Sequence, residues 1–140
     1  MPRVVHYEFE FAYRFSRTGG LYPILSFRVN NPRSAALSVE VNGFLDSGAK
    51  ASLFDGSLLK AIGANLLDGP HRVFSGPAGN SWSVRMHDVH LAHELLGRFA
   101  LNAGFSETPV ERNILGRDFF NLAQIGFREH HLTFYVTPHP

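Results

Sequence analysis

The 140-residue chain contains no cysteine, which excludes disulfide bonds, thiolate nucleophiles and cysteine-ligated metals. Charged residues make up only 18% of it, and the formal net charge of +1 comes without a stripe of Lys and Arg, so we expect no nucleic-acid partner. No apolar run approaches the roughly 18 residues of a membrane-spanning helix, and the N-terminus lacks the apolar segment of a signal peptide. These absences predict a soluble, cytoplasmic chain with no membrane partner.

Apolar residues are plentiful, at 44% of the chain with 13 Phe, so a sizeable core is expected. Apolar side chains occupy the odd positions from Val5 to Phe15, and this period of two predicts a half-buried strand that serves core or dimer-interface packing. Asn42-Gly43 is a strong turn signal. Further strands are expected over residues 21–30, 37–41, 73–74, 82–91, 99–105 and 132–136, and short helices over 58–62 and from 119 until Gly126 ends the second one.

A carboxylate follows one of the expected strands. Residues 44–49 read Phe-Leu-Asp-Ser-Gly-Ala, and a carboxylate at the buried end of a strand is costly unless something pairs with it or uses it. We expect Gly48 to take backbone angles that a side chain forbids. Asp-Ser-Gly is also an ordinary turn sequence, so this stretch alone leaves a plain surface turn open.

Two later stretches add to the first. Residues 75–80, Ser-Gly-Pro-Ala-Gly-Asn, form the tip of an expected hairpin, and residues 113–118, Asn-Ile-Leu-Gly-Arg-Asp, open a short helix. The ordered trio resembles the retroviral-type aspartic proteases (retropepsins and their cellular relatives). Their pattern is an apolar pair before Asp-Thr/Ser-Gly-Ala/Ser, a flap hairpin, and an apolar pair before Gly-Arg-Asn/Asp. The resemblance covers about residues 21–136, and residues 1–20 extend it as an N-terminal strand.

The resemblance implies one all-β domain over residues 1–140, a closed retropepsin-like β-barrel with a flap hairpin and one or two short helices. It also implies an aspartic-type endopeptidase, a hydrolase that needs no cofactor and no metal. Two carboxylates about 3 Å apart share a proton, so one takes a proton from water while the other donates to the peptide carbonyl. Since the chain holds a single Asp-Ser-Gly, the dyad requires Asp46 from two copies, in a homodimer that cleaves a polypeptide.

Site residues follow from the resemblance. The Ser47 hydroxyl would bond across the dimer axis, and Asp118 would reach the hydroxyl of Ser52. The catalytic residues are Asp46, Ser47 and Gly48. The substrate-binding residues are Ala49, Phe74, Ser75, Gly76, Pro77, Ala78 and Gly79. The residues that support the site are Ile114, Leu115, Gly116, Arg117 and Asp118.

Two positions depart from the family pattern. Lys50 stands where retroviral members often have an acidic residue that pairs with the Arg of Gly-Arg, so Arg117 needs another partner: Asp55, Asp118 or a residue of the other subunit. Pro77 removes a backbone donor from the hairpin tip.

Other interpretations remain open at this stage. A retropepsin-like fold can act as a dimerising or peptide-binding module with little or no proteolysis, and a monomeric β-domain without a dyad is a third hypothesis. His87, His90 and His93 suggest a metal site, but on a strand the middle one points away from the other two, so we expect satisfied or solvent-facing histidines.

Overall fold

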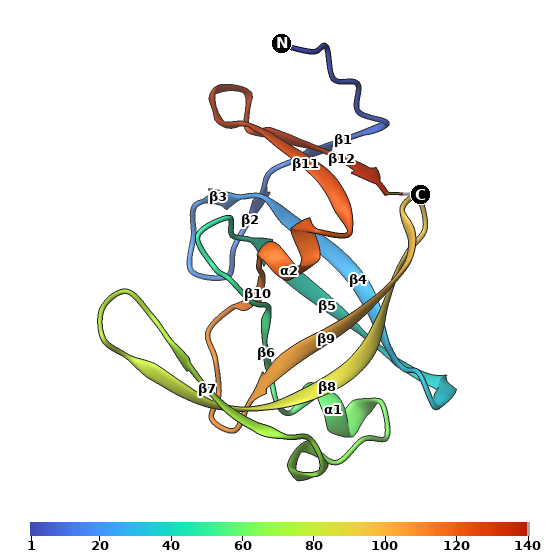
Figure 1. Ribbon diagram of the computed structural model, residues 1–140, viewed down its shortest axis with the longest axis vertical. Helices are drawn as coiled ribbons and strands as arrows, with labels where there is room; N and C mark the ends of the chain where they lie inside the picture. Colours follow the sequence, from blue (N-terminus) through green and yellow to red (C-terminus); the bar gives the residue numbers. More distant parts are fainter. Residues whose placement is uncertain (140) are drawn as a thin grey trace.

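The computed structural model describes residues 1–139, apart from the side chain of Ala35. Strands dominate it and the helices are short (Figure 1). In chain order the elements are β1 (Phe9–Ala12), β2 (Arg14–Phe15), β3 (Leu21–Tyr22), β4 (Ile24–Asn31), β5 (Ser34–Leu45), β6 (Leu53–Asp55), α1 (Leu58–Ala61), the 3-10 helix η1 (Leu66–Asp68), β7 (His71–Ser75), β8 (Ser81–His93), β9 (Gly97–Ser106), β10 (Asn113–Leu115), α2 (Arg117–Phe120), β11 (Ala123–Arg128), the 3-10 helix η2 (Glu129–His131) and β12 (Thr133–Pro138).

Six strands close into a barrel. The main sheet has the order β4-β5-β10-β6-β9-β8-β7, and an additional pairing of β4 with β8 joins its ends, leaving β7 outside the ring. Along β4 the side chains of Leu25, Phe27 and Val29 are buried, as their period of two predicts. The expected all-β class and the closed barrel are both confirmed.

A cluster of phenylalanines fixes α2 against the barrel. Phe119 of α2 is fully buried, and its ring centroid lies 5.5 Å from that of Phe27 and 5.2 Å from that of Phe99, both in edge-to-face geometry. Burying one such ring contributes about 1.5–3 kcal/mol. Helix α2, which begins within residues 113–118, is therefore anchored to β4 and β9 through these rings.

The short strand β10 lies between two strands from earlier in the chain. It runs parallel to β5, with Leu115 opposite Leu45, and antiparallel to β6. Gly43 allows this approach, because a Cβ there would lie 2.6 Å from the Leu115 side chain. The predicted turn at Asn42-Gly43 is therefore wrong: β5 continues through it to Leu45, since the missing side chain serves close packing and not a change of direction.

The two ends of the chain form a second sheet of order β1-β12-β11. Phe9 pairs with Val136 and Phe11 with Phe134, but the pairing stops at Ala12 because β12 begins at Thr133. The predicted strand from Val5 to Phe15 is thus confirmed only in part: residues 9–12 form β1, and residues 14–15 form β2, which pairs with β3, while residues 5–8 are not in a strand. The chain changes partner after Ala12, and the Phe15 side chain is 76% exposed.

Two other predicted boundaries differ from the structure. Pro23 separates β3 from β4 in the strand expected over residues 21–30, because proline has no N–H to donate to a ladder. The second helix ends at Phe120 and not at Gly126, which lies inside β11 under the hydroxyl of Tyr7. From Ala123 onward the chain pairs with β12, and this pairing prevails over helix propensity.

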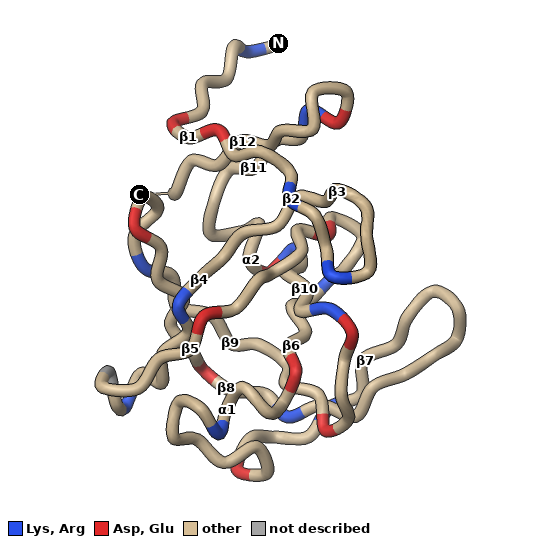
Figure 2. Tube along the Cα trace, turned by 180° about the vertical axis from the view of Figure 1, so that it is seen from behind, with Lys and Arg blue, Asp and Glu red and all other residues tan. Residues whose placement is uncertain are grey.

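Charges of both signs are interspersed along the chain in the view of Figure 2. Over the described residues, no helix has both the length and the apolar character needed to cross a membrane.

Candidate active site

Asp46 begins the turn that follows β5. Its backbone N–H donates to the Leu115 carbonyl at 3.0 Å, and its own carbonyl accepts from the Ala49 N–H at 3.2 Å, which closes a four-residue turn. The carboxylate Oδ1 accepts from the Gly48 N–H at 2.9 Å. The side chain of Asp46 is exposed in the single chain. The turn therefore orients a carboxylate toward open space.

The predicted backbone conformation of Gly48, one that a side chain would forbid, is wrong. Its φ is not among the positive values, which occur at other glycines of the described chain, so it does not use a left-handed conformation. A Cβ at this position would lie 3.2 Å from the Asp46 carboxylate oxygen. The absence of a side chain here leaves room for the carboxylate and does not relieve backbone strain.

Residues 114–117 support the Asp46 turn through backbone contacts. The Arg117 N–H donates to the Ala49 carbonyl at 2.8 Å, so the start of α2 bonds directly to the turn. Gly116 allows the approach, because a Cβ there would lie 2.7 Å from the Ala51 carbonyl carbon and 2.8 Å from the Ala49 oxygen. The sequence 114–117 is thus positioned beside the Asp46 turn by backbone contacts that a larger residue at position 116 would prevent.

Ser52 connects the two motifs. It is fully buried, and its hydroxyl donates to Asp118 Oδ1 at 2.6 Å while accepting from the Gly116 N–H at 3.0 Å. Its backbone N–H donates to Asp118 Oδ2 at 2.9 Å. The predicted contact between Asp118 and the Ser52 hydroxyl is confirmed.

Arg117 has no ion-pair partner within residues 1–139. Asp118 is bonded to Ser52 instead, and the Asp55 carboxylate accepts backbone N–H groups of Ser57 and Val110. Burial alone would raise the pKa of Asp55, but the hydrogen bonds from Ser57 and Val110 prevail and hold that pKa below its ordinary value. The prediction that Asp55 or Asp118 pairs with Arg117 is wrong, and a residue of the other subunit stays a prediction.

A hairpin of β7 and β8 extends from the barrel (Figure 1). Phe74 pairs with Trp82, and the tip is closed by a bond from the Gly76 N–H to the Asn80 carbonyl at 2.8 Å. The Phe74 ring lies against Gly104 of β9, where a Cβ would be 2.5 Å away. The residues of the tip from Pro77 to Asn80 are exposed.

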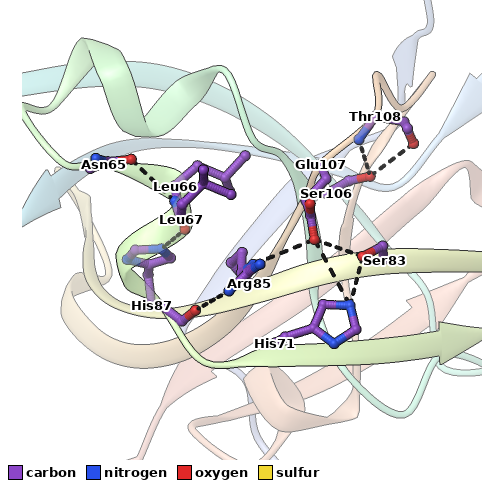
Figure 3. A network of polar contacts seen from close by, with 11 residues as sticks. Asn65, Leu66, Leu67, His71, Ser83, Arg85, His87, Ser106, Glu107 and Thr108 are labelled. Atoms are coloured by element: carbon purple, nitrogen blue, oxygen red, sulfur yellow. Dashed lines mark hydrogen bonds and ion pairs between the residues drawn. The ribbon is translucent and has the colours of Figure 1, made fainter.

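Glu107 holds the base of this hairpin (Figure 3). Its carboxylate accepts from the Ser83 hydroxyl at 2.6 Å and from Arg85 Nε at 3.4 Å, and His71 Nε2 lies 3.9 Å away. The hydrogen bond from Ser83, with a smaller contribution from Arg85, keeps the pKa of Glu107 below its ordinary value although desolvation opposes it. Residues from β7, β8 and the loop before β10 thus meet at one carboxylate.

The sequence indicates only a loop at Glu107 and gives no signal for Arg112, whose guanidinium carbon lies over the rings of Tyr22 and Phe44. No local pattern marks either residue, because their partners lie more than twenty positions away in the chain.

The three histidines of β8 have separate environments. His87 Nε2 lies 2.8 Å from the Leu66 carbonyl oxygen, while His93 Nδ1 accepts from the Leu95 and Leu96 N–H groups. Burial lowers the pKa of His93, against the charge of Glu94. Among the described residues no group of three potential ligands is arranged to hold a metal ion.

Comparison with known proteins gives similarity in structure alone. No protein-family model matches the chain, and no curated protein matches it. The solved structure of EIAV protease complexed with the inhibitor HBY-793 is similar with a TM-score of 0.50 and 19% identity, over 71% of this chain and 86% of that one. A retropepsin-like aspartic protease from Rickettsia conorii gives a TM-score of 0.62 at 11% identity, over 96% of this chain and 98% of that one. The chain has a retropepsin-like fold.

Proposed function

We propose that the protein is an aspartic endopeptidase that becomes active as a homodimer. The observation that carries this proposal is the Asp46 turn, where an exposed carboxylate is held by its own loop and braced from below by Leu115 and Arg117. A surface turn that only reverses the chain does not need hydrogen bonds to a second, distant segment such as residues 115–117. Two solved structures that share the fold are named as proteases, which agrees with this chemistry.

Hydrolysis in this scheme uses two Asp46 carboxylates at one water. The ionised carboxylate removes a proton from the water, whose oxygen attacks the peptide carbonyl carbon, and the protonated carboxylate donates its proton to the carbonyl oxygen. The carboxyl group that took the water's proton then donates it to the amine nitrogen and the C–N bond breaks, while a hydroxyl proton of the tetrahedral species passes to the other carboxylate, which restores the singly protonated pair. No covalent bond to the protein forms in any step.

The second carboxylate must come from another copy. The carboxylates of Asp55 and Asp118 are occupied by hydrogen bonds from Ser57, Val110 and Ser52. A twofold axis beside the turn would place Asp46 against its equivalent, and the Ser47 hydroxyl would bond to the partner's backbone. The exposed Arg117 would then lie near the interface, where a partner carboxylate can neutralise it.

The hairpin of β7 and β8 serves as the flap in this proposal. Its tip, residues 75–80, would close over an extended substrate and exclude water, while Ala49 and Phe74 would line the groove. Glu107 would keep the base fixed during this motion, since it bonds to Ser83 and Arg85.

The proposal is tested by cleavage of a peptide library, analysed by mass spectrometry between about pH 3 and pH 9. We expect cleavage with an acid-side optimum, because the rate falls when both carboxylates ionise. Asp46→Asn should abolish cleavage, whereas the control Asp68→Asn, at an exposed carboxylate without hydrogen-bond partners in the described chain, should leave it unchanged. Equal cleavage by the Asp46→Asn variant, or a rate that does not change with pH, would contradict the proposal.

Mixing tests whether two copies share one site. Wild-type and Asp46→Asn chains are unfolded together in equal amounts and refolded, so that subunits combine at random. If each site needs both carboxylates, only the wild-type homodimers cleave, and activity falls to about one quarter of that of the wild-type protein alone at the same total chain concentration. A fall to one half would show that each chain works by itself.

The alternative is a retropepsin-like module that dimerises or binds peptides without cleaving them. It predicts that sedimentation detects a dimer and that peptides bind, while neither the wild-type protein nor Asp46→Asn cleaves anything. A mass that stays monomeric at all concentrations, together with no cleavage, would favour the third hypothesis of a β-domain without a dyad.

A further inference from the structure

Arg112 is held by two aromatic rings. Its guanidinium carbon lies 4.4 Å from the centroid of the Tyr22 ring and 4.8 Å from that of Phe44. The two rings are themselves 5.5 Å apart and inclined by 56°. Cation–π contacts of this kind restrain the position of a guanidinium and remove part of its hydration.

No carboxylate neutralises this cation in the described part of the chain. Neither an ion pair nor a hydrogen bond involves the Arg112 side chain within residues 1–139, although a guanidinium carries five N–H donors. Because the two ring centroids lie only 5.5 Å apart, both rings lie toward one side of the guanidinium carbon and do not enclose it. The side chain is half-buried, so these donors are only partly available to water.

The position of Arg112 places it beside the Asp46 turn. Leu45 and Leu115 face the core, so Phe44 and its neighbour Ile114 point to the other side of the sheet, and Arg112, two residues before Ile114, points there too. Phe44 precedes Asp46 by two residues, which is about 7 Å along a strand. The guanidinium thus lies on the side of the sheet away from the core, close to the turn.

The loop that carries Arg112 connects the hairpin to the turn. At its start the Glu107 N–H donates to the Ser83 carbonyl at 3.0 Å, and at its end Leu115 accepts from the Asp46 N–H. Figure 1 shows this loop (orange) running from the end of β9, beside β7 and β8, to β10. Residues 107–112 therefore connect the hairpin base to the segment that bonds to the Asp46 turn. In the proposed function, these residues would border the groove that an extended substrate occupies.

We propose that Arg112 determines substrate specificity by binding an acidic side chain of the polypeptide, one of those next to the scissile bond. This inference rests on the proposed function. A guanidinium restrained from one side by two rings, with no hydrogen bond to its N–H groups in the described chain, can offer two parallel N–H groups that match a carboxylate, and charge-assisted bonds of this type are among the strong ones. Lys50, an exposed cation without an ion-pair partner in the described chain, follows the same turn and adds positive potential that favours an acidic peptide.

The cleavage arm of the test compares peptides that differ only in having Glu, Gln or Lys at each position around the cleaved bond. For the wild-type protein we expect kcat/KM to be at least about tenfold higher with Glu than with Gln at one position. Arg112→Gln should remove this difference, Arg112→Lys should retain part of it, and Arg112→Glu should favour Lys. The matched control is Arg98→Gln, at an exposed arginine of β9, and it should behave as wild type. Thermal midpoints of all variants show whether each one is folded.

The binding arm does not depend on cleavage. Acidic and neutral peptides are titrated into full-length Asp46→Asn protein, with and without Arg112→Gln, and followed by calorimetry. Selective binding of acidic peptides that Arg112→Gln abolishes supports the inference even if the wild-type protein cleaves nothing, in which case only the proposed function fails. Cleavage without any acidic preference, or equal binding of acidic and neutral peptides, overturns the inference and leaves the proposed function standing.

Discussion

Asp118 accepts two hydrogen bonds from Ser52, a residue 66 positions earlier, one from the backbone N–H at 2.9 Å and one from the hydroxyl at 2.6 Å. The same hydroxyl accepts from the Gly116 N–H. The segment that leads away from the Asp46 turn and the segment that begins α2 are therefore joined at one buried serine. This junction holds the turn independently of any partner subunit.

Replacing Asp118 should weaken this junction. Asp118→Asn converts one acceptor to a donor and leaves a buried Ser52 group without a partner, which costs about 1–3 kcal/mol in the free energy of unfolding. Urea denaturation measures the loss. The control Asp68→Asn, at an exposed carboxylate, should change the free energy by less than about 0.5 kcal/mol. An equal effect of the two substitutions would show that the junction contributes nothing.

Adding a methyl group at Gly116 should displace the segment below the turn. The Cβ of Gly116→Ala would meet backbone atoms of Ala49 and Ala51 at 2.7–2.8 Å, and such overpacking costs about 1–3 kcal/mol. Because the clash involves the turn that carries Asp46, cleavage should fall together with the thermal midpoint. Gly97→Ala is the comparison: it has a φ of +83° but open space around its Cβ, so it should lower stability without altering cleavage.

Tyr13 should make stability sensitive to alkaline pH. Burial, together with the hydrogen bond and charge of Glu129, raises the pKa of Tyr13 from 10.0 to about 12. A raised pKa means that the contribution is complete below pH 10.0 and is lost as the pH rises toward about 12. Tyr13→Phe should lower the free energy of unfolding at neutral pH by about 1 kcal/mol and flatten its alkaline decline. Tyr135→Phe, at a hydroxyl without a hydrogen bond in the described chain, is the control.

Glu107 should make the hairpin base sensitive to acid. Its pKa lies below the ordinary 4.5, so the contribution is present above pH 4.5 and is lost as the pH falls through the lower value of the folded state. Hydrogen exchange of the β7 and β8 amides, corrected for intrinsic rates, should accelerate in that range. Glu107→Gln should show the faster exchange already at neutral pH, whereas Glu10→Gln, an exposed residue of β1, should not. Unchanged protection in Glu107→Gln would contradict the assignment.

The barrel strands could be predicted because their signal is local. Leu25, Phe27 and Val29 alternate with polar residues, and one buried face fixes this pattern in β4. The ends of strands could not be predicted in the same way, since the ladder of β1 stops where its partner β12 begins, more than a hundred residues later. The alternation up to Phe15 carries no information about that partner's length.

Much of the candidate site followed from the ordered motifs, and the rest depends on distant contacts. Residues 44–49 and 113–118 could be connected because their resemblance to a known family pattern supplies the long-range pairing, and the contact of Asp118 with Ser52 was expected on the same ground. Gly48 was assigned the wrong purpose, since a glycine in a turn suggests a positive φ whereas here it makes room for a carboxylate. Arg112 meets its two rings only through the fold, and no spacing in the sequence indicates it.

The in-chain pairing of β1 with β12 has a consequence for regulation by concentration. Because the first and last strands bond to each other, a protomer can complete its sheet without borrowing a strand from a second copy. A separated single chain should then still unfold in a cooperative transition, with a thermal midpoint that stops changing once dilution has dissociated the dimer, while cleavage per chain decreases as subunits separate. Local abundance would act as a reversible on–off control, with an intact, reusable reserve of inactive single chains.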